Sequence, residues 1–165
     1  MEVSRTDGGL FNLPARFVSA SGEETAAIGE RCAALLSSGS IVALEGPLGA
    51  GKTCFSQGVA RALGVTEPVT SPTYTIVREY QISTAPARAA PFPALLYHID
   101  AYRLNGSDDF YAIGGDEILF SGGISLIEWS VRIEDCIPNG AFVVEIEILN
   151  DGTRSISIRI KGDGA

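Results

Sequence analysis

Eight consecutive residues have the composition and spacing of a phosphate-binding loop. They fit the pattern G-x-x-x-x-G-K-[ST] without a gap and are Gly46, Pro47, Leu48, Gly49, Ala50, Gly51, Lys52 and Thr53. Glycines allow backbone amides to converge on phosphate oxygens, because no Cβ stands in the way. The lysine can reach the β- and γ-phosphates of a nucleotide, and the threonine hydroxyl can ligate Mg²⁺. This segment therefore predicts a site for the phosphates of a nucleoside triphosphate.

Two acidic residues follow short apolar segments, and either could hold Mg²⁺ beside this loop. Asp100 follows residues 95–99, and Glu128 follows residues 124–127. Both segments are typical of buried strands, and in a parallel sheet their carboxyl ends would open at the same edge as the loop. For each acid alone, a helix cap or a surface ion pair is the alternative. The pair favours a division of labour in which one carboxylate serves the metal and the other orients an attacking water.

Three further polar features lie close to these motifs. Residues 70–73 read Thr-Ser-Pro-Thr, and this loop, which ends in Thr73, could close over a γ-phosphate or form an ordinary turn into a strand. Cys54 extends the phosphate-binding segment into the following helix, where simple packing is the alternative. His98, the only histidine, alternates with Tyr97 along its strand. We expect it to be packed and hydrogen-bonded rather than catalytic.

The elements that would hold these residues alternate between helix and strand. Ser21 and Glu24 form a capping box that predicts the start of a helix, with Gly39 as its stop. A buried strand precedes the phosphate loop and a helix follows it, which is the opening of a parallel α/β sheet. Apolar and polar residues alternate over 142–148 and 156–160 around an Asn-Asp-Gly turn, which predicts a hairpin. The fold class is therefore α/β: a P-loop NTPase with a central, mainly parallel sheet flanked by helices and a C-terminal antiparallel hairpin.

Length and composition indicate one domain, residues 1–165. Residues 1–15 are expected to be a flexible arm, and residues 83–94, rich in alanine and proline, an exposed loop insertion. Twelve Lys and Arg against twenty Asp and Glu give a net charge of −8, which argues against binding nucleic acid over a broad surface. The three cysteines are too few and too far apart for a structural zinc site made of thiolates, and the single histidine excludes any site that needs two. No apolar stretch is long enough to span a bilayer, so we expect no membrane contact and a cytoplasmic location.

Four segments of the chain match the motifs of a known family in the same order. They are the phosphate loop at 46–53, Val-Thr-Ser-Pro-Thr-Tyr-Thr at 69–75, Tyr-His-Ile-Asp-Ala-Tyr-Arg-Leu at 97–104 and Leu-Ile-Glu-Trp at 126–129. With these segments the chain resembles the TsaE family, also called YjeE, of bacterial tRNA threonylcarbamoyladenosine biosynthesis ATPases. The insertion at 83–94 looks longer than is usual in the family, and Ser130-Val131-Arg132 departs from its pattern after Glu-Trp.

The resemblance implies a small P-loop ATPase that binds ATP and Mg²⁺, forms ADP, and assists TsaB and TsaD. Those partners would place a threonylcarbamoyl group on adenosine next to the anticodon of tRNA. The ATPase would not perform the transfer itself; its hydrolysis, slow alone and dependent on partners, would reset or license the TsaB–TsaD pair. Residues 100–151 carry eleven acids against two arginines, so we expect contact with tRNA only indirectly, through the complex.

By motif position, the resemblance also implies roles for single residues. Lys52 would bind phosphate, and Thr53 and Glu128 would hold Mg²⁺. Asp100 would act near the γ-phosphate, so the catalytic candidates are Lys52, Asp100 and Glu128. Outside the phosphate loop, the residues expected to contact the nucleotide are Thr25 at the base, Cys54, Thr73 and Arg132.

Three other function classes compete with an ATPase. A small-molecule kinase would need an arginine-rich lid and an acceptor pocket, whereas the ten arginines of this chain are scattered. A GTPase of the usual kind would need an N-K-x-D motif, which is absent from the sequence. A module that binds nucleotide only as a switch for partner docking would use the same ligands as a slow ATPase. We rank the ATPase first, the kinase second and the switch third.

Overall fold

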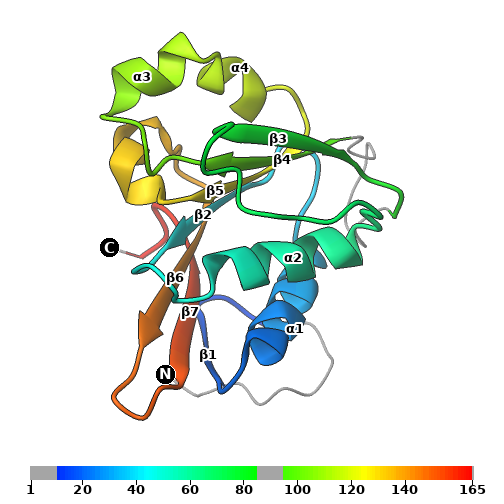
Figure 1. Ribbon diagram of the computed structural model, residues 1–165, viewed down its shortest axis with the longest axis vertical. Coiled ribbons are helices and arrows are strands. Elements are labelled where there is room, and N and C mark those ends of the chain that lie inside the picture. Colours follow the sequence, from blue (N-terminus) through cyan, green and yellow to red (C-terminus); the bar gives the residue numbers. More distant parts are fainter. Residues whose placement is uncertain (1–10, 85–94, 165) are drawn as a thin grey trace.

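A seven-stranded sheet forms the centre of the computed structural model, which describes residues 11–84 and 95–164 (Figure 1). Helices and strands alternate over most of the chain, as the sequence predicts. In chain order the elements are β1 (Ala15–Ser19), α1 (Gly22–Ala33), β2 (Ile41–Glu45), α2 (Lys52–Ala62), β3 (Val77–Gln81), β4 (Leu95–Asp100), α3 (Ser107–Ala112), α4 (Gly115–Leu119), β5 (Ile124–Glu128), the 3-10 segment η1 (Ser130–Cys136), β6 (Phe142–Ile148) and β7 (Arg154–Ile160).

The strand order β1-β7-β6-β2-β5-β4-β3 combines parallel and antiparallel pairing. Strands β6, β2, β5 and β4 are parallel to their neighbours within this group. The edges are antiparallel: β3 pairs with β4, while β6, β7 and β1 run alternately up and down. This arrangement confirms the predicted α/β fold with a parallel centre and a C-terminal hairpin. It also brings the carboxyl ends of β2, β4 and β5 to one edge of the sheet.

Helical segments cover both faces of the sheet, so its central strands β2, β4 and β5 are buried on both sides (Figure 1). On one face, Val42 and Leu126 belong to a buried cluster completed by α1 and α2. On the other, Ala43 and Ile127 pack in a second cluster with residues of α3, α4 and η1. No helix in residues 11–84 and 95–164 is long and apolar enough to cross a membrane.

Two glycines allow α1 and α2 to approach each other closely beside the phosphate loop. A Cβ added at Gly29 would overlap the carbonyl oxygen of Phe55, and one added at Gly58 would overlap the carbonyl oxygen of Ala26. In both cases the obstacle is backbone, which cannot move aside as a flexible side chain would. The helix that begins at Lys52 is therefore fixed in position by its contact with α1.

Gly58→Ala is expected to lower the free energy of unfolding by about 1–3 kcal/mol, the usual cost of an overpacked core. At an open helix site the same replacement would raise the free energy of unfolding by about 1 kcal/mol, because helices prefer alanine to glycine. Urea denaturation followed by far-ultraviolet circular dichroism measures the change. Ala27, exposed on α1, is the matched control, because Ala27→Gly should show the ordinary preference for alanine. A Gly58→Ala protein as stable as wild type would contradict the close packing.

The N-terminal arm predicted over residues 1–15 is too long. Phe11 is buried and its ring packs edge-on against Phe17, with ring centroids 4.9 Å apart. Ala15 begins β1, which pairs with β7, and the inward side chains of Ala15 and Phe17 pack in the buried cluster on that face of the sheet. The remaining part of that prediction, residues 1–10, lies outside the described residues.

Two other predicted boundaries concern the end of α1 and the insertion at 83–94. The first differs from the structure, and most of the second lies outside the described residues. Helix α1 ends at Ala33 rather than at Gly39, because the chain tightens into turns in which the amides of Ala34 and Leu35 bond to carbonyls three residues back. Of the predicted insertion at 83–94, only Ser83 and Thr84 are described, and residues 85–94 lie outside the description.

Candidate nucleotide site

The phosphate loop lies between the end of β2 and the start of α2, at the carboxyl edge of the parallel strands. Gly46 and Gly51 have φ values of 144° and 114°, which side chains rarely permit. At Gly46 an added Cβ would also overlap the carbonyl oxygen of Ile146 on β6. Gly51 is the N-cap of α2, so the positive end of the helix dipole lies at the loop. The local geometry is suited to an anion such as phosphate.

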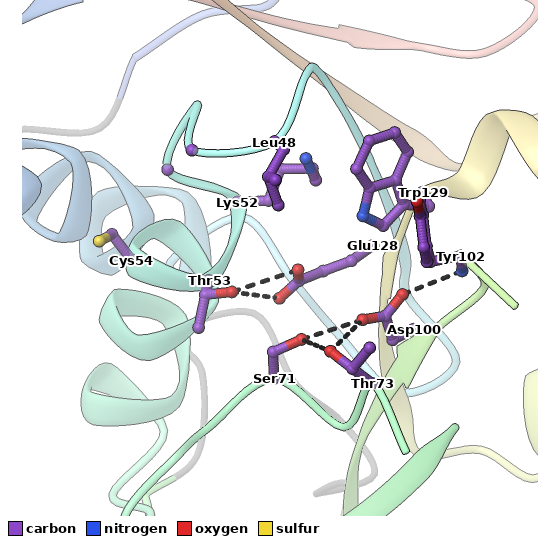
Figure 2. A pocket seen from close by; sticks show the side chains of 12 residues that line it. Leu48, Lys52, Thr53, Cys54, Ser71, Thr73, Asp100, Tyr102, Glu128 and Trp129 are labelled. Atoms are coloured by element: carbon purple, nitrogen blue, oxygen red, sulfur yellow. Dashed lines mark hydrogen bonds between the residues drawn. The ribbon is translucent and has the colours of Figure 1, made fainter. Parts of the chain in front are cut away.

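The two predicted acids stand side by side at the same edge (Figure 2). Asp100 and Glu128 end the neighbouring parallel strands β4 and β5 and are direct register partners. Each is 3% exposed, so neither is an ordinary surface carboxylate. A buried carboxylate needs hydrogen-bond donors or a cation nearby, and both residues have donors close to the phosphate loop.

Glu128 is joined to the loop through Thr53. The Thr53 hydroxyl donates to the two carboxylate oxygens of Glu128 at 3.0 and 3.2 Å. Lys52 donates from Nζ to the carbonyl oxygens of Gly46 at 2.7 Å and Pro47 at 2.9 Å. Its Nζ also lies 4.1 Å from the ring centroid of Trp129. The loop, the helix and the end of β5 are thus connected by direct polar contacts.

Burial lowers the pKa of the Lys52 ammonium, and the nearby carboxylates of Glu128 and Asp100 partly offset this by favouring its charged form. The lysine is therefore a desolvated cation that lacks a direct carboxylate partner within salt-bridge distance in the described part of the chain. A ligand that brings negative charge into the site would relieve this desolvation.

Asp100 is held by the loop that precedes β3. Ser71 and Thr73 donate from their hydroxyls to Oδ2 at 2.9 and 3.1 Å, and the backbone amide of Tyr102 donates to Oδ1 at 2.9 Å. The loop ends in a tight turn in which Ile76 has a φ of 66°, an unusual value for a β-branched residue. Residues 70–76 therefore form a turn into a strand, which is one of the two structures that the sequence predicts for the Thr-Ser-Pro-Thr loop. The same residues also orient Asp100.

These residues surround a cavity of about 490 Å³. Figure 2 shows side chains from the loop, α2, β4, β5 and the residues that follow those strands converging on it. Its lining residues are Leu48, Gly49, Gly51, Lys52, Thr53, Cys54, Ser71, Thr73, Asp100, Tyr102, Glu128 and Trp129. Gly46, Pro47 and Ala50 complete the loop without lining the cavity, and Ala50 is fully buried.

The structure does not bring two of the expected nucleotide contacts to the cavity. Thr25 is 1% exposed, and its hydroxyl is within 2.7 Å of the Ser19 hydroxyl, so it packs beneath the loop beside Gly51. Arg132 is exposed, with its guanidinium carbon 5.5 Å from the ring centroid of Tyr102. Arg132 therefore lies outside the cavity, beyond a residue that lines it. Both expectations came from motif position, which does not determine which way a side chain points.

The model of the protein family described as "Threonylcarbamoyl adenosine biosynthesis protein TsaE" matches residues 19–156. The chain belongs to the TsaE family. A relative from Treponema pallidum named tRNA threonylcarbamoyladenosine biosynthesis protein TsaE is 38% identical over 143 residues, covering 87% of this chain and 98% of its own. The Bacillus subtilis protein of the same name is 38% identical over 141 residues, 86% and 82% of the two chains. The crystal structure of Bacillus subtilis YdiB superposes with a TM-score of 0.73 at 32% identity, covering 94% of this chain and 90% of that one.

One residue that supports the loop of this TsaE-family chain was missed by the sequence reasoning. Arg154, at the start of β7, donates from its guanidinium to the carbonyl oxygens of Gly49 at 3.2 Å and Ala50 at 3.4 Å. Because peptide units are planar, a carbonyl turned toward Arg154 directs the following amide the opposite way. No local signal could have found this contact, since Arg154 and Ala50 are 104 residues apart in the chain.

The donor atoms at this TsaE-family site fit Mg²⁺. Thr53 and Glu128 offer a hydroxyl and a carboxylate, and Asp100 adds a second carboxylate close by. Among the described residues there is no group of three or more His, Cys, Asp or Glu side chains placed to hold a metal. That is compatible with Mg²⁺, which uses one or two protein oxygens and completes its shell with phosphate oxygens and water.

Proposed function

We propose that this chain binds and hydrolyses Mg-ATP to support the modification of tRNA by the TsaB–TsaD complex. The observation that carries the proposal is the meeting of Lys52, Thr53, Asp100 and Glu128 at one cavity behind a phosphate-binding loop. The names of the relatives, which refer to tRNA threonylcarbamoyladenosine biosynthesis, supply the biological setting. ATP and tRNA are substrates of the cell interior, so the proposed place of action is the cytoplasm.

In this proposal the loop and the start of α2 bind the phosphates. Lys52, which now donates to two carbonyl oxygens, would exchange these partners for phosphate oxygens, and the backbone amides of the loop would donate to the same anion. Thr53 and Glu128 would hold Mg²⁺, which when bound draws charge from the β- and γ-phosphate oxygens. These contacts stabilise negative charge as the bond between the γ-phosphorus and the bridging oxygen breaks.

Asp100 is the proposed partner of the attacking water. Three donors from Ser71, Thr73 and the amide of Tyr102 fix the orientation of its carboxylate. An oriented carboxylate next to the γ-phosphate can accept a hydrogen bond from water and point its oxygen at phosphorus. The products are ADP and inorganic phosphate. Contact with tRNA passes through TsaB and TsaD, because residues 100–151 carry eleven acids and two arginines.

Phosphate release from Mg-ATP by the purified protein, alone and with the TsaB–TsaD pair, tests the proposal. We expect slow release alone and strong stimulation by the pair. Bound nucleotide without release in either condition would contradict hydrolysis and favour the switch. Transfer of the phosphate to a small acceptor would instead favour a kinase.

A further inference from the structure

His98 lies next to the site without lining its cavity. It is on β4, two residues before Asp100, and its side chain is fully buried. Its Nε2 is 2.7 Å from Oε1 of Glu128, a shorter contact than either bond from Thr53. In the register of the sheet, His98 is opposite Leu126. The imidazole therefore reaches along the strand direction to Glu128, two residues further along β5.

The direction of this hydrogen bond follows from the atoms involved. An ionised carboxylate only accepts hydrogen bonds, so Nε2 carries the proton and donates to Oε1. The other ring nitrogen, Nδ1, is buried and has no hydrogen-bond partner in the part of the chain that the structure describes. The imidazole is thus used at one end only, and that end is directed at Glu128.

This arrangement is not one that packing alone would favour. An unpaired buried nitrogen costs free energy, and an apolar side chain would suit a position opposite Leu126. The hydrogen bond also has a specific effect on Glu128. It occupies Oε1 and restricts rotation of the carboxylate, while the Thr53 hydroxyl approaches the same group from α2. The carboxylate is held between two strands and a helix before any ligand arrives.

We propose that His98 is a positioning residue, which orients the Glu128 carboxylate for the divalent cation of the nucleotide complex. The inference rests on the proposed Mg-ATP chemistry and adds a residue to it. His98 acts through Glu128 and touches neither nucleotide nor metal. Partners of this kind, which orient a ligand by hydrogen bonding, typically change metal affinity or activity by about 10- to 100-fold when they are removed.

The test measures metal binding directly, so it does not depend on turnover. Mn²⁺, which is paramagnetic and replaces Mg²⁺, is titrated into the protein with saturating ADP and followed by electron paramagnetic resonance. His98→Leu removes the donor but keeps an apolar side chain in place. His98→Gln keeps an N–H at about the reach of Nε2, and His98→Asn, one carbon shorter, does not. Ser125→Ala is the matched control, because Ser125 lies on β5 and its buried hydroxyl has no partner in the described residues.

The expected result is Mn²⁺ affinity about 10- to 100-fold weaker in the Leu and Asn variants, and close to wild type in the Gln variant and the Ser125→Ala control. Affinity for ADP in the presence of EDTA should not change in any of them. Fluorescence of Trp129 reports that binding, since it is the only tryptophan and lines the cavity.

Wild-type Mn²⁺ affinity in a folded His98→Leu protein would overturn the inference and leave the proposed function intact. If the His98→Leu protein does not fold, the Mn²⁺ affinities of the His98→Asn and His98→Gln proteins are compared instead. Equal affinities in these two variants would overturn the inference. A wild-type protein that binds no Mn²⁺ with ADP would overturn the proposed function, and this inference with it.

Discussion

Replacing Glu128 with glutamine is expected to lower Mg-ATP hydrolysis on the order of 10²- to 10³-fold while ADP still binds. Glutamine has nearly the same shape but no charge, and its amide group would face donors, because both Thr53 and His98 donate to Glu128. In the proposed mechanism the metal would therefore lose an anionic ligand, whereas the loop and Lys52 would still bind the phosphates. Single-turnover phosphate release measures the chemical step, and calorimetric titration with ADP in EDTA measures the retained binding.

Glu45→Gln is the matched control for this prediction. Glu45 ends β2, the strand beside β5, but its side chain lines a separate cavity of about 110 Å³. Burial and repulsion from Glu145 raise the pKa of Glu45, so removal of its charge relieves an unfavourable interaction. This variant should hydrolyse ATP at the wild-type rate. Full turnover in Glu128→Gln, or an equal loss in Glu45→Gln, would contradict the assigned role of Glu128.

The parts of the site that can be predicted from sequence are those with a local signal. The glycine-rich loop is contiguous, and its place between a strand and a helix follows from neighbouring apolar patterns. Asp100 and Glu128 each end an apolar segment, so a parallel sheet is enough to bring them to one edge. The same reasoning yields the hairpin of β6 and β7, whose alternating residues and turn are close in the chain.

The remaining contacts depend on register and on side-chain direction, which have no local signal. The bond from His98 to Glu128 exists because β4 and β5 align Asp100 with Glu128, and a shift of one residue would turn His98 to the other face. Arg154 reaches the loop only because β7 lies beside β6, which lies beside β2. The strand β1 was missed for a related reason. Its alternation over five residues is short, and pairing with β7 at the other end of the chain makes it a strand.

Replacing Lys52 with methionine is expected to weaken ATP binding by about 10- to 100-fold, the range for one charged hydrogen bond of roughly 1.5–3 kcal/mol. Hydrolysis should fall further, because negative charge develops on the oxygen that bridges the β- and γ-phosphates as its bond to the γ-phosphorus breaks, and Lys52 is a desolvated cation at the cavity. Methionine keeps an unbranched side chain but lacks the ammonium group, which lies 4.1 Å from the ring centroid of Trp129. Isothermal titration calorimetry is the suitable measurement of affinity, since loss of a cation 4.1 Å from the ring centroid would itself alter Trp129 fluorescence.

The chain contains an unusually close control for this variant. Lys161, the other lysine, also donates from Nζ to two backbone carbonyls, those of Glu134 at 2.9 Å and Ile137 at 2.8 Å. Lys161→Met therefore removes the same number of lysine–carbonyl bonds at a place that does not line the large cavity. If both variants lose stability alike and only Lys52→Met loses ATP, the ammonium of Lys52 acts on the nucleotide rather than on the loop. Equal ATP affinity in the two variants would mean that Lys52 only ties the loop together, and the phosphate site would have to be assigned elsewhere.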